Sequence, residues 1–217
     1  MKMKETDLSA KVVEWLQDQR WEVYQEVKFG GWAYGQRCAD IVAVNGPIMW
    51  IIECKTSCSL AVIEQAHRWI RTANMVSIAV PKQNNFSEHV CRAFGIGIIS
   101  LCKHVCDIGV SENVRPKLWR FSTKRYRDKL EPEHKTFAKA GTSSGKSWTP
   151  FTRTCREVLN AVNRQPGLSI KDLIKGIDHH YNTASTARAS LKLWIEKGKV
   201  PGVRMERDGR FLRVYPS

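Results

Sequence analysis

The sequence predicts an α/β protein whose first domain has a mixed central sheet and whose second domain is smaller and mainly helical. Two apolar, strand-like runs, 37–44 and 48–55, flank Asn45-Gly46-Pro47, which is typical of a hairpin. Helix-like and strand-like segments alternate from residue 8 to residue 101. Apolar residues then thin out and return at residue 150. We therefore expect domains at 1–108 and 149–217, joined by a basic linker at 109–148.

The first domain opens with a helix and three strands. Apolar residues at near-helical spacing predict a helix over 8–19. Residues 21–29 alternate, which predicts a half-buried strand with Trp21, Val23, Val27 and Phe29 on one face. Glu26 is expected on the other face. A loop at 30–35 leads into the central hairpin.

The rest of the domain alternates helices and strands. A helix is expected over about 59–73, and a buried strand over 75–80, closed by Pro81. A second helix spans 86–94 before Gly95, and a further strand covers 97–101. The order of helix, three strands, helix and strand indicates helices packed against a mixed sheet.

Charge favours a polyanionic partner. The chain carries 35 Lys and Arg against 21 Asp and Glu, a net charge of +14. Such an excess favours nucleic acid first and an anionic membrane second. No apolar run approaches the roughly 20 residues of a membrane span, so no spanning segment is expected. DNA, and not a membrane, is the expected partner. Within the linker, basic and aromatic residues interleave. Lys124 and Arg125 could contact phosphates there, or the segment could be a merely basic tether.

The N-terminus and the cysteines indicate a cytoplasmic protein. Residues 1–7 lack the apolar core of a signal peptide. The seven cysteines are an odd number, and Cys38 and Cys54 fall in expected core strands. Buried thiols therefore fit better than a disulfide framework.

The second domain combines helices with a hairpin. A helix is expected over 151–164, Ser169 caps a short helix, and Thr183 begins a third. Strands at 203–206 and 211–215 meet at Asp208-Gly209, a strong turn signal. This arrangement resembles a winged helix-turn-helix domain, a fold used for DNA binding and also for protein pairing. The resemblance implies DNA contacts by the third helix and the wing, from Thr183, Ser185, Thr186, Arg188, Lys192, Arg207 and Arg210.

Three charged residues interrupt the apolar hairpin. Asp40, Glu53 and Lys55 lie in runs where a charge is costly unless it is paired or bound to metal. Glu53 and Lys55 share a strand face, whereas Cys54 points away, and an antiparallel neighbour can bring Asp40 beside them. Two carboxylates and an ammonium form a hard oxygen site that suits Mg²⁺. The alternative is an ion pair at the sheet edge.

This constellation resembles the core of the PD-(D/E)xK nuclease superfamily, which includes Holliday-junction resolvases and restriction endonucleases. The motif reads Ala39-Asp40 and then Glu53-Cys54-Lys55, with Ala39 in place of the superfamily's proline. The resemblance covers roughly residues 7–101 and implies a restriction-endonuclease-like fold. It also implies that Asp40, Glu53 and the Cys54 carbonyl bind Mg²⁺, or Mn²⁺ as a substitute. Lys55 would orient a water molecule or neutralise charge on the phosphate.

Further site residues follow from the same resemblance. A further acidic ligand is common in the superfamily, and the two candidates are Glu26 on the first strand and Glu14 in the first helix. We favour Glu26, because a strand neighbour of Asp40 needs less reach. Gln65 follows Lys55 by ten residues, and resembles a helix glutamine that supports the site in several subfamilies.

The expected activity is Mg²⁺-dependent hydrolysis of DNA phosphodiester bonds, with the C-terminal domain placing the enzyme on duplex or branched DNA. One such site cuts one strand, so a duplex break needs a homodimer or two successive events. Phages and other mobile elements, repair and restriction are all compatible settings. Two alternatives remain: a catalytically silent DNA-binding regulator that keeps the fold, and a nuclease subunit acting on RNA or only within a larger complex.

A nucleotide-binding loop is a weak alternative for one segment. Ala140–Ser147 fits a relaxed phosphate-loop pattern. Such a loop must follow a buried strand and open a helix, and residues 135–139 make a poor strand. We therefore expect no ATP site there.

Overall fold

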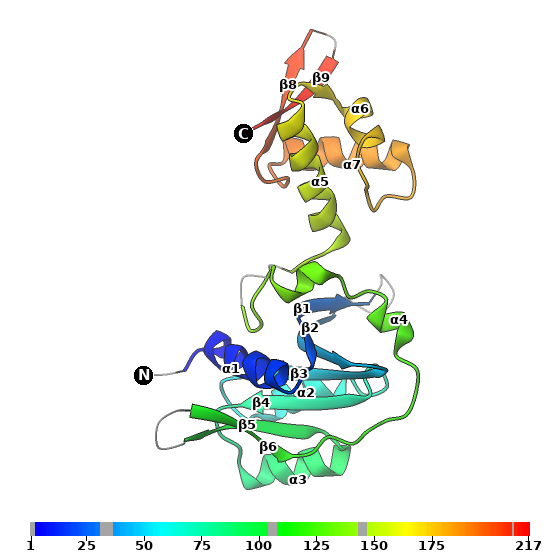
Figure 1. Ribbon diagram of the computed structural model, residues 1–217. Coiled ribbons are helices and arrows are strands. Elements are labelled where there is room, and N and C mark those ends of the chain that lie inside the picture. The colour runs from blue at the N-terminus through cyan, green and yellow to red at the C-terminus, as the bar shows by residue number, and fades with distance from the viewer. Residues whose placement is uncertain (1–2, 31–36, 104–107, 143–146, 210) are drawn as a thin grey trace. The chain divides into compact units, whose positions relative to one another are not determined.

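The computed structural model describes residues 3–30, 37–103, 108–142, 147–209 and 211–217 (Figure 1). The chain divides into two compact units, Met1–Trp148 and Thr149–Ser217. The first unit has the predicted α/β class, with a mixed sheet that has six strands in the described residues. Within the same ranges, each helix is too short or too polar to cross a lipid bilayer.

The strands of the first unit lie side by side in chain order. They are β1 (Glu22–Phe29), β2 (Arg37–Asn45), β3 (Ile48–Cys54), β4 (Met75–Val80), β5 (Gly97–Lys103) and β6 (Ile108–Val114). The pairs β1–β2, β2–β3 and β5–β6 are antiparallel, whereas β3–β4 and β4–β5 are parallel. The predicted central hairpin is therefore β2–β3, and Gly46 turns it with a φ of 56°.

Two apolar layers cover the two faces of the sheet. Helix α1 (Glu5–Asp18) buries Leu8, Val12 and Leu16 against one face, and we call this packing the α1 layer. Helices α2 (Leu60–His67) and α3 (Asn85–Phe94) pack on the other face, which we call the α2/α3 layer. Figure 1 shows α1 and α3 on opposite sides of the strands. Burial on both faces explains why the central strands are apolar throughout.

The expected alternation along β1 is wrong beyond its midpoint. Val23 packs in the α1 layer, but Val27 and Phe29 pack in the α2/α3 layer. Between them, Glu26 has a φ of 52°, a left-handed conformation that is unfavourable for a residue with a Cβ. This single residue rotates the strand. Odd-numbered side chains face the α1 layer before Glu26 and the α2/α3 layer after it.

The expected linker at 109–148 is also wrong, because this segment belongs to the first unit. Strand β6 extends the sheet, and Trp119, Tyr126 and Leu130 pack against the α2/α3 layer. The segment includes α4 (Lys124–Arg127) and a short 3₁₀ helix, η1 (Pro132–Lys135). The side-chain amide of Asn74, 2% exposed, donates to the carbonyls of Trp119 and Phe121 at 2.9 Å each.

Helix α2 is shorter than expected. The prediction extended it to residue 73, but it ends at His67, and Arg71 has a φ of 72°. Residues 68–73 therefore form an irregular connection that returns the chain to β4. Helix α3 ends as predicted, with Gly95 in the left-handed conformation at a φ of 68°.

The second unit packs three helices against a small sheet. Its elements are α5 (Pro150–Arg164), β7 (Leu168–Ser169), α6 (Ile170–Lys175), α7 (Ala184–Glu196), β8 (Val203–Asp208) and β9 (Phe211–Pro216). The strand order is β7-β9-β8. The hydroxyls of Ser169 and Thr183 accept the predicted N-cap hydrogen bonds of α6 and α7. Val158, Leu191 and Val214 are fully buried in its core.

The side chain of Asn74 anchors the segment 109–148 to the first unit, and a substitution tests this role. Asn74→Ala leaves the buried amide N–H of Met49 and the carbonyls of Trp119 and Phe121 without this partner. We expect the free energy of unfolding to fall by at least about 2 kcal/mol, measured by urea denaturation. Asn45→Ala, at an exposed position, should change it by less than about 0.5 kcal/mol. Equal effects of the two substitutions would contradict the anchoring role.

Candidate active site

Three carboxylates lie in a row across the first three strands. The β2–β3 register ends at the pair Ile41–Ile52, so the next positions, Asp40 and Glu53, oppose each other. On its other side, β2 pairs with β1 on both sides of Glu26, which places Glu26 opposite Asp40. The structure therefore brings Glu26, Asp40 and Glu53 together, as the sequence suggested. We call this set the carboxylate row.

Lys55 joins the row from the end of β3. Its ammonium donates to Oε1 of Glu5 at 2.7 Å, from the first turn of α1. Sequence reasoning missed Glu5, because the helix was expected to begin at Leu8. Glu14, the alternative acidic candidate, is exposed on α1 and has no place in this cluster.

Backbone amides and an indole hold the row in place. Oδ2 of Asp40 accepts from the Cys54 amide at 2.8 Å. Oε1 of Glu53 accepts from Nε1 of Trp69 at 2.6 Å. Oε1 of Glu26 accepts from the Gly141 amide at 2.9 Å. Each carboxylate is thus oriented by a donor that does not carry a full charge.

A loop from the expected linker covers one end of the row. The Ala140 carbonyl accepts from Oγ of Ser9 at 2.6 Å, which ties residues 139–142 to α1. Gly141 has a φ of 76°, and a Cβ there would lie 2.8 Å from Cγ of Glu5. Glycine is required on both counts. The described residues before the phosphate-loop pattern form η1 rather than a strand, and Gly145 and Lys146 lie outside the described residues.

Glu53 opens into a cavity of about 180 Å³ beneath α2. Gln65 lines this cavity together with Trp69, so the predicted glutamine does lie beside Glu53. Oε1 of Gln65 is buried and has no hydrogen-bond partner among the residues that the structure describes. The exposed side chains of Arg37 and Arg68 border the same cavity. The site thus offers an unused amide oxygen, and the Arg37 cation and the ion pair of Arg68 with Glu64 lie next to the acidic row.

Burial makes this row costly in the fully ionised state. Desolvation raises the pKa of Asp40 to about 6, despite the amide hydrogen bond from Cys54. Desolvation, and then repulsion by Asp40, raise the pKa of Glu53 to about 8. Burial also raises the pKa of Glu26. Lys55 alone does not balance these groups, so the cluster favours an additional positive charge.

The donor set fits a hard divalent cation. No group of three or more His, Cys, Asp or Glu is arranged as a ready-made metal site in the described part of the chain. Carboxylate oxygens are nevertheless the ligands that Mg²⁺ prefers, and a cation would relieve the mutual repulsion of Asp40 and Glu53. These two residues would hold it, with Glu26 and the Cys54 carbonyl as the further predicted ligands. The Cys54 thiol is buried in the α1 layer and points away, as expected.

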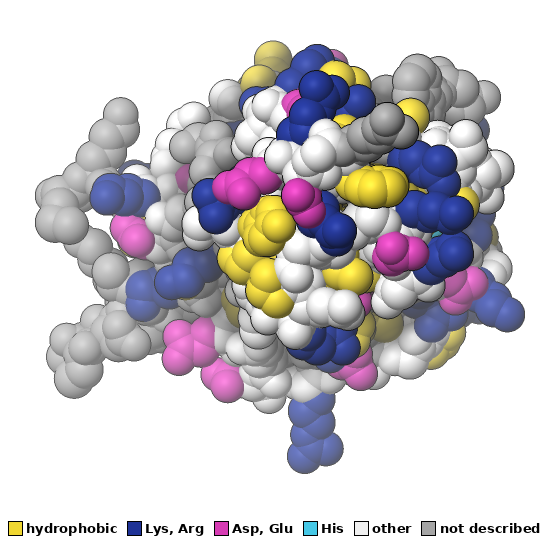
Figure 2. All heavy atoms as spheres, turned by 90° about the horizontal axis from the view of Figure 1, so that it is seen from above, with side chains coloured by type: hydrophobic (Ala, Val, Ile, Leu, Met, Phe, Trp, Pro, Cys, Tyr) yellow, Lys and Arg dark blue, Asp and Glu magenta, His cyan; other side chains and the backbone are white. Residues whose placement is uncertain are grey.

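The residues predicted to contact DNA lie on exposed surface wherever the structure describes them. Arg188 and Lys192 are exposed on α7, and so are Ser185 and Thr186 near its start. Thr183 caps this helix, and its hydroxyl accepts from the Thr186 amide at 3.1 Å. The remaining predicted contacts are placed as follows: Arg207 is exposed on β8, Lys124 and Arg125 are exposed on α4 of the first unit, and Arg210 lies outside the described residues. Figure 2 shows Lys and Arg side chains in several groups over the face in view, with Asp and Glu among them.

Comparison with known proteins adds no relative. No protein-family model matches the chain, and no curated protein or solved structure matches it either.

The carboxylate row makes a testable contribution to the pH dependence of stability. The folded-state pKa values of Asp40 and Glu53 are raised, so the folded chain holds more protons than the unfolded chain between about pH 4 and pH 8. In EDTA, stability should therefore fall as pH rises through this window, by at least about 2 kcal/mol, since one unit of raised pKa costs about 1.4 kcal/mol. Urea denaturation at a series of pH values measures this loss.

Asp40→Asn provides the control for this pH dependence. It removes the charge that repels Glu53, so the slope should become shallower, and Mg²⁺ should stabilise the wild type at high pH but the variant much less. Parallel slopes for the two proteins would contradict the assignment.

Proposed function

We propose that this chain is a Mg²⁺-dependent DNA endonuclease of the PD-(D/E)xK type, whose active site is built from Asp40, Glu53 and Lys55. The observation that carries the proposal is the carboxylate row beside an ammonium at the end of a buried hairpin. A buried excess of carboxylates destabilises a fold, and such costly groups are concentrated at binding and catalytic sites. The order of α1, β1, β2, β3, α2 and β4 also agrees with the core of that superfamily.

The residues divide the work of phosphodiester hydrolysis. A divalent cation held by Asp40 and Glu53 would polarise the scissile phosphate and lower the pKa of a bound water molecule. Trp69 and the Cys54 amide fix the orientation of these two carboxylates. Gln65 has a free amide oxygen in the same cavity, which suits a positioning role toward water or DNA.

Lys55 acts as a cation rather than as a base. Burial disfavours its charge, but the hydrogen bond from its ammonium to Glu5 and the nearby carboxylates raise the pKa of Lys55 above its usual value. At neutral pH it therefore keeps its protons. Its chemistry is to donate hydrogen bonds and stabilise negative charge that develops on the phosphate. Glu5 is the positioning residue for this group.

The second unit would hold the DNA. Its three helices and the β8–β9 hairpin are arranged in the order of a winged helix-turn-helix domain. The polar side chains at the start of α7, together with Arg188 and Lys192, are exposed as a recognition helix requires. The chain's net charge of +14 adds an affinity for phosphate that should weaken steeply with salt.

Cleavage of a nucleic-acid panel tests the proposal. Supercoiled plasmid, linear duplex, single strand, branched junction and RNA are incubated with Mg²⁺, Mn²⁺ or EDTA. We expect metal-dependent cutting of DNA, reduced roughly 10³-fold by Asp40→Asn and by Lys55→Ala while DNA binding is retained. Tight binding without cutting in either metal would instead indicate a silent regulator or a missing partner. Cutting that survives both substitutions would place the site elsewhere.

Substitutions of two glutamates on α1 distinguish the positioning of Lys55 by Glu5 from a general effect of removing a negative charge. Glu5→Gln removes the anionic partner of Lys55, and we expect the maximal cleavage rate to fall about tenfold with little change in DNA affinity. Glu14→Gln makes the same change at an exposed position on α1 and should leave the rate unaltered. Similar rates for the two variants would show that Glu5 does not position Lys55.

A further inference from the structure

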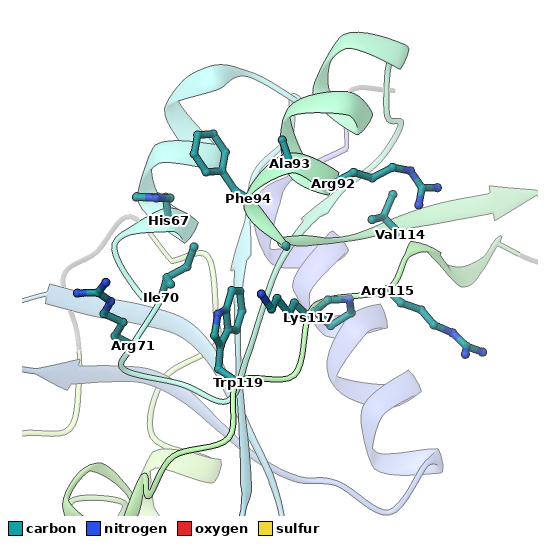
Figure 3. A pocket seen from close by; sticks show the side chains of 12 residues that line it. His67, Ile70, Arg71, Arg92, Ala93, Phe94, Val114, Arg115, Lys117 and Trp119 are labelled. Carbon is teal, nitrogen blue, oxygen red and sulfur yellow. The ribbon is translucent and has the colours of Figure 1, made fainter.

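A second pocket lies at the ends of α2 and α3, separate from the carboxylate row. Its volume is about 740 Å³, a size typical of small-ligand sites. His67, Ile70 and Arg71 line it, whereas Gln65, Arg68 and Trp69 line the cavity at Glu53. The connection after α2 therefore separates two distinct pockets. Figure 3 shows the second one, which we call the α2–α3 pocket.

The α2–α3 pocket is strongly cationic. Its lining contains no Asp or Glu and includes four basic side chains, Arg71, Arg92, Arg115 and Lys117. Arg92 is paired with Glu88 at 2.8 Å on α3, and Arg115 lies 3.8 Å from Glu112. Arg71 and Lys117 have no ion pair among the residues that the structure describes. Two cations are thus available to an incoming anion.

The C-terminal ends of two helices offset only part of this positive charge. Helices α2 and α3 both finish at the pocket, and the C-terminal end of a helix carries about half a negative charge. The two ends together offset about one cation. A carbonyl at each end is also used within the fold: Gly95 accepts from the Lys117 amide at 2.9 Å, and His67 accepts from the Ile70 amide at 3.1 Å. A net positive potential remains.

The centre of the pocket is aromatic and apolar. Trp119 and Ile70 line it, and the rings of His67 and Phe94 meet edge to face with centroids 4.9 Å apart. The Trp119 amide donates to the Asn74 carbonyl at 2.8 Å, which fixes the backbone beneath the indole. The wall is tightly fitted, because a Cβ on Gly95 would lie 2.8 Å from Cβ of Lys117.

The cations are arranged on more than one side of the apolar centre. In Figure 3, the Lys117 side chain runs toward Trp119 and Ile70 in the middle of the pocket. Arg71 points out on one side, and Arg92 and Arg115 point out on the other. A nucleic-acid strand presents the matching pattern, with a flat base between two phosphates. A free nucleotide carries its phosphates on one side of the base only.

We propose that the α2–α3 pocket binds one unpaired nucleotide of a nucleic-acid strand. The base lies against Trp119, Lys117 contacts the sugar-phosphate at the centre, and Arg71 contacts the phosphate on one side. Stacking of a base on an aromatic ring contributes about 1–3 kcal/mol and tolerates any base. The proposal goes beyond cleavage, and binding at this pocket requires neither metal nor the carboxylate row.

Binding of a short single strand tests this site in the full-length chain. The probe is a fluorescein-labelled DNA of roughly 12 nucleotides in EDTA, followed by anisotropy. We expect Arg71→Glu and Lys117→Glu each to weaken binding about tenfold and to flatten the salt dependence. The matched control is Arg20→Glu. Arg20 is also exposed and has a φ of 64°, close to the 72° of Arg71, and it should change affinity less than about twofold.

Photocrosslinking provides a measurement that does not depend on a folded variant. Wild-type protein is irradiated with the same strand carrying 5-iodouracil, and the crosslinked peptide is identified by mass spectrometry. A crosslink at Trp119 or His67 supports the proposal. Two results would overturn it. In the first, Arg71→Glu and Lys117→Glu bind the strand as Arg20→Glu does, and no crosslink falls in 67–71 or 114–119. In the second, a free nucleoside monophosphate competes for the site as effectively as the unlabelled strand. Because no metal is present, failure of cleavage and failure of this site are distinguishable.

Discussion

The first unit is organised around the repulsion between carboxylates that its sheet holds out of water. Asp40 and Glu53 oppose each other on adjacent strands, and Glu26 extends the row. Three segments each supply a hydrogen-bond donor: the end of β3 beside the row itself, the connection after α2 and the loop at 139–142. The first turn of α1 in turn anchors Lys55, the cation beside the row. The helices and the loop are thus tied to the same few atoms, and each of these hydrogen bonds offsets part of the cost of burying the row.

Much of this could be predicted from local patterns. The spacing of apolar residues and the turn residues predict the hairpin and the helix end at Gly95. The antiparallel register of the hairpin then predicts that Asp40 lies opposite Glu53. All of these are short-range properties of the sequence. The errors arise where contacts between distant segments decide the structure. The segment at 109–148 looks like a linker by composition, yet Asn74 holds it from 45 residues away. Glu26 reverses the faces of β1 through a left-handed backbone that its side chain does not favour. Glu5 lies before the first apolar residue of its helix, so the spacing of apolar residues does not show that Glu5 belongs to the helix.

The positive charge is divided between different kinds of surface. On α7 the basic and polar side chains are exposed on a regular helix, which suits a groove of duplex DNA. The α2–α3 pocket combines cations with aromatic rings, which suits an unpaired base. Arg37 and Arg68 border the cavity at Glu53, where a phosphate would need to approach. Net charge alone predicts affinity for nucleic acid, whereas the local surroundings of each cation distinguish the three proposed roles.

The hydrogen bond between Trp69 and Glu53 also makes the site optically observable. Indole emission responds to nearby charge, and Nε1 of Trp69 lies 2.6 Å from a carboxylate whose ionisation is strongly perturbed. Protonation of Glu53, or a cation beside it, changes the field at the excited ring. Trp69 is therefore a built-in fluorophore at the candidate active site. The difference between the emission spectra of the wild type and a Trp69→Phe variant isolates its signal from the other tryptophans without an attached dye.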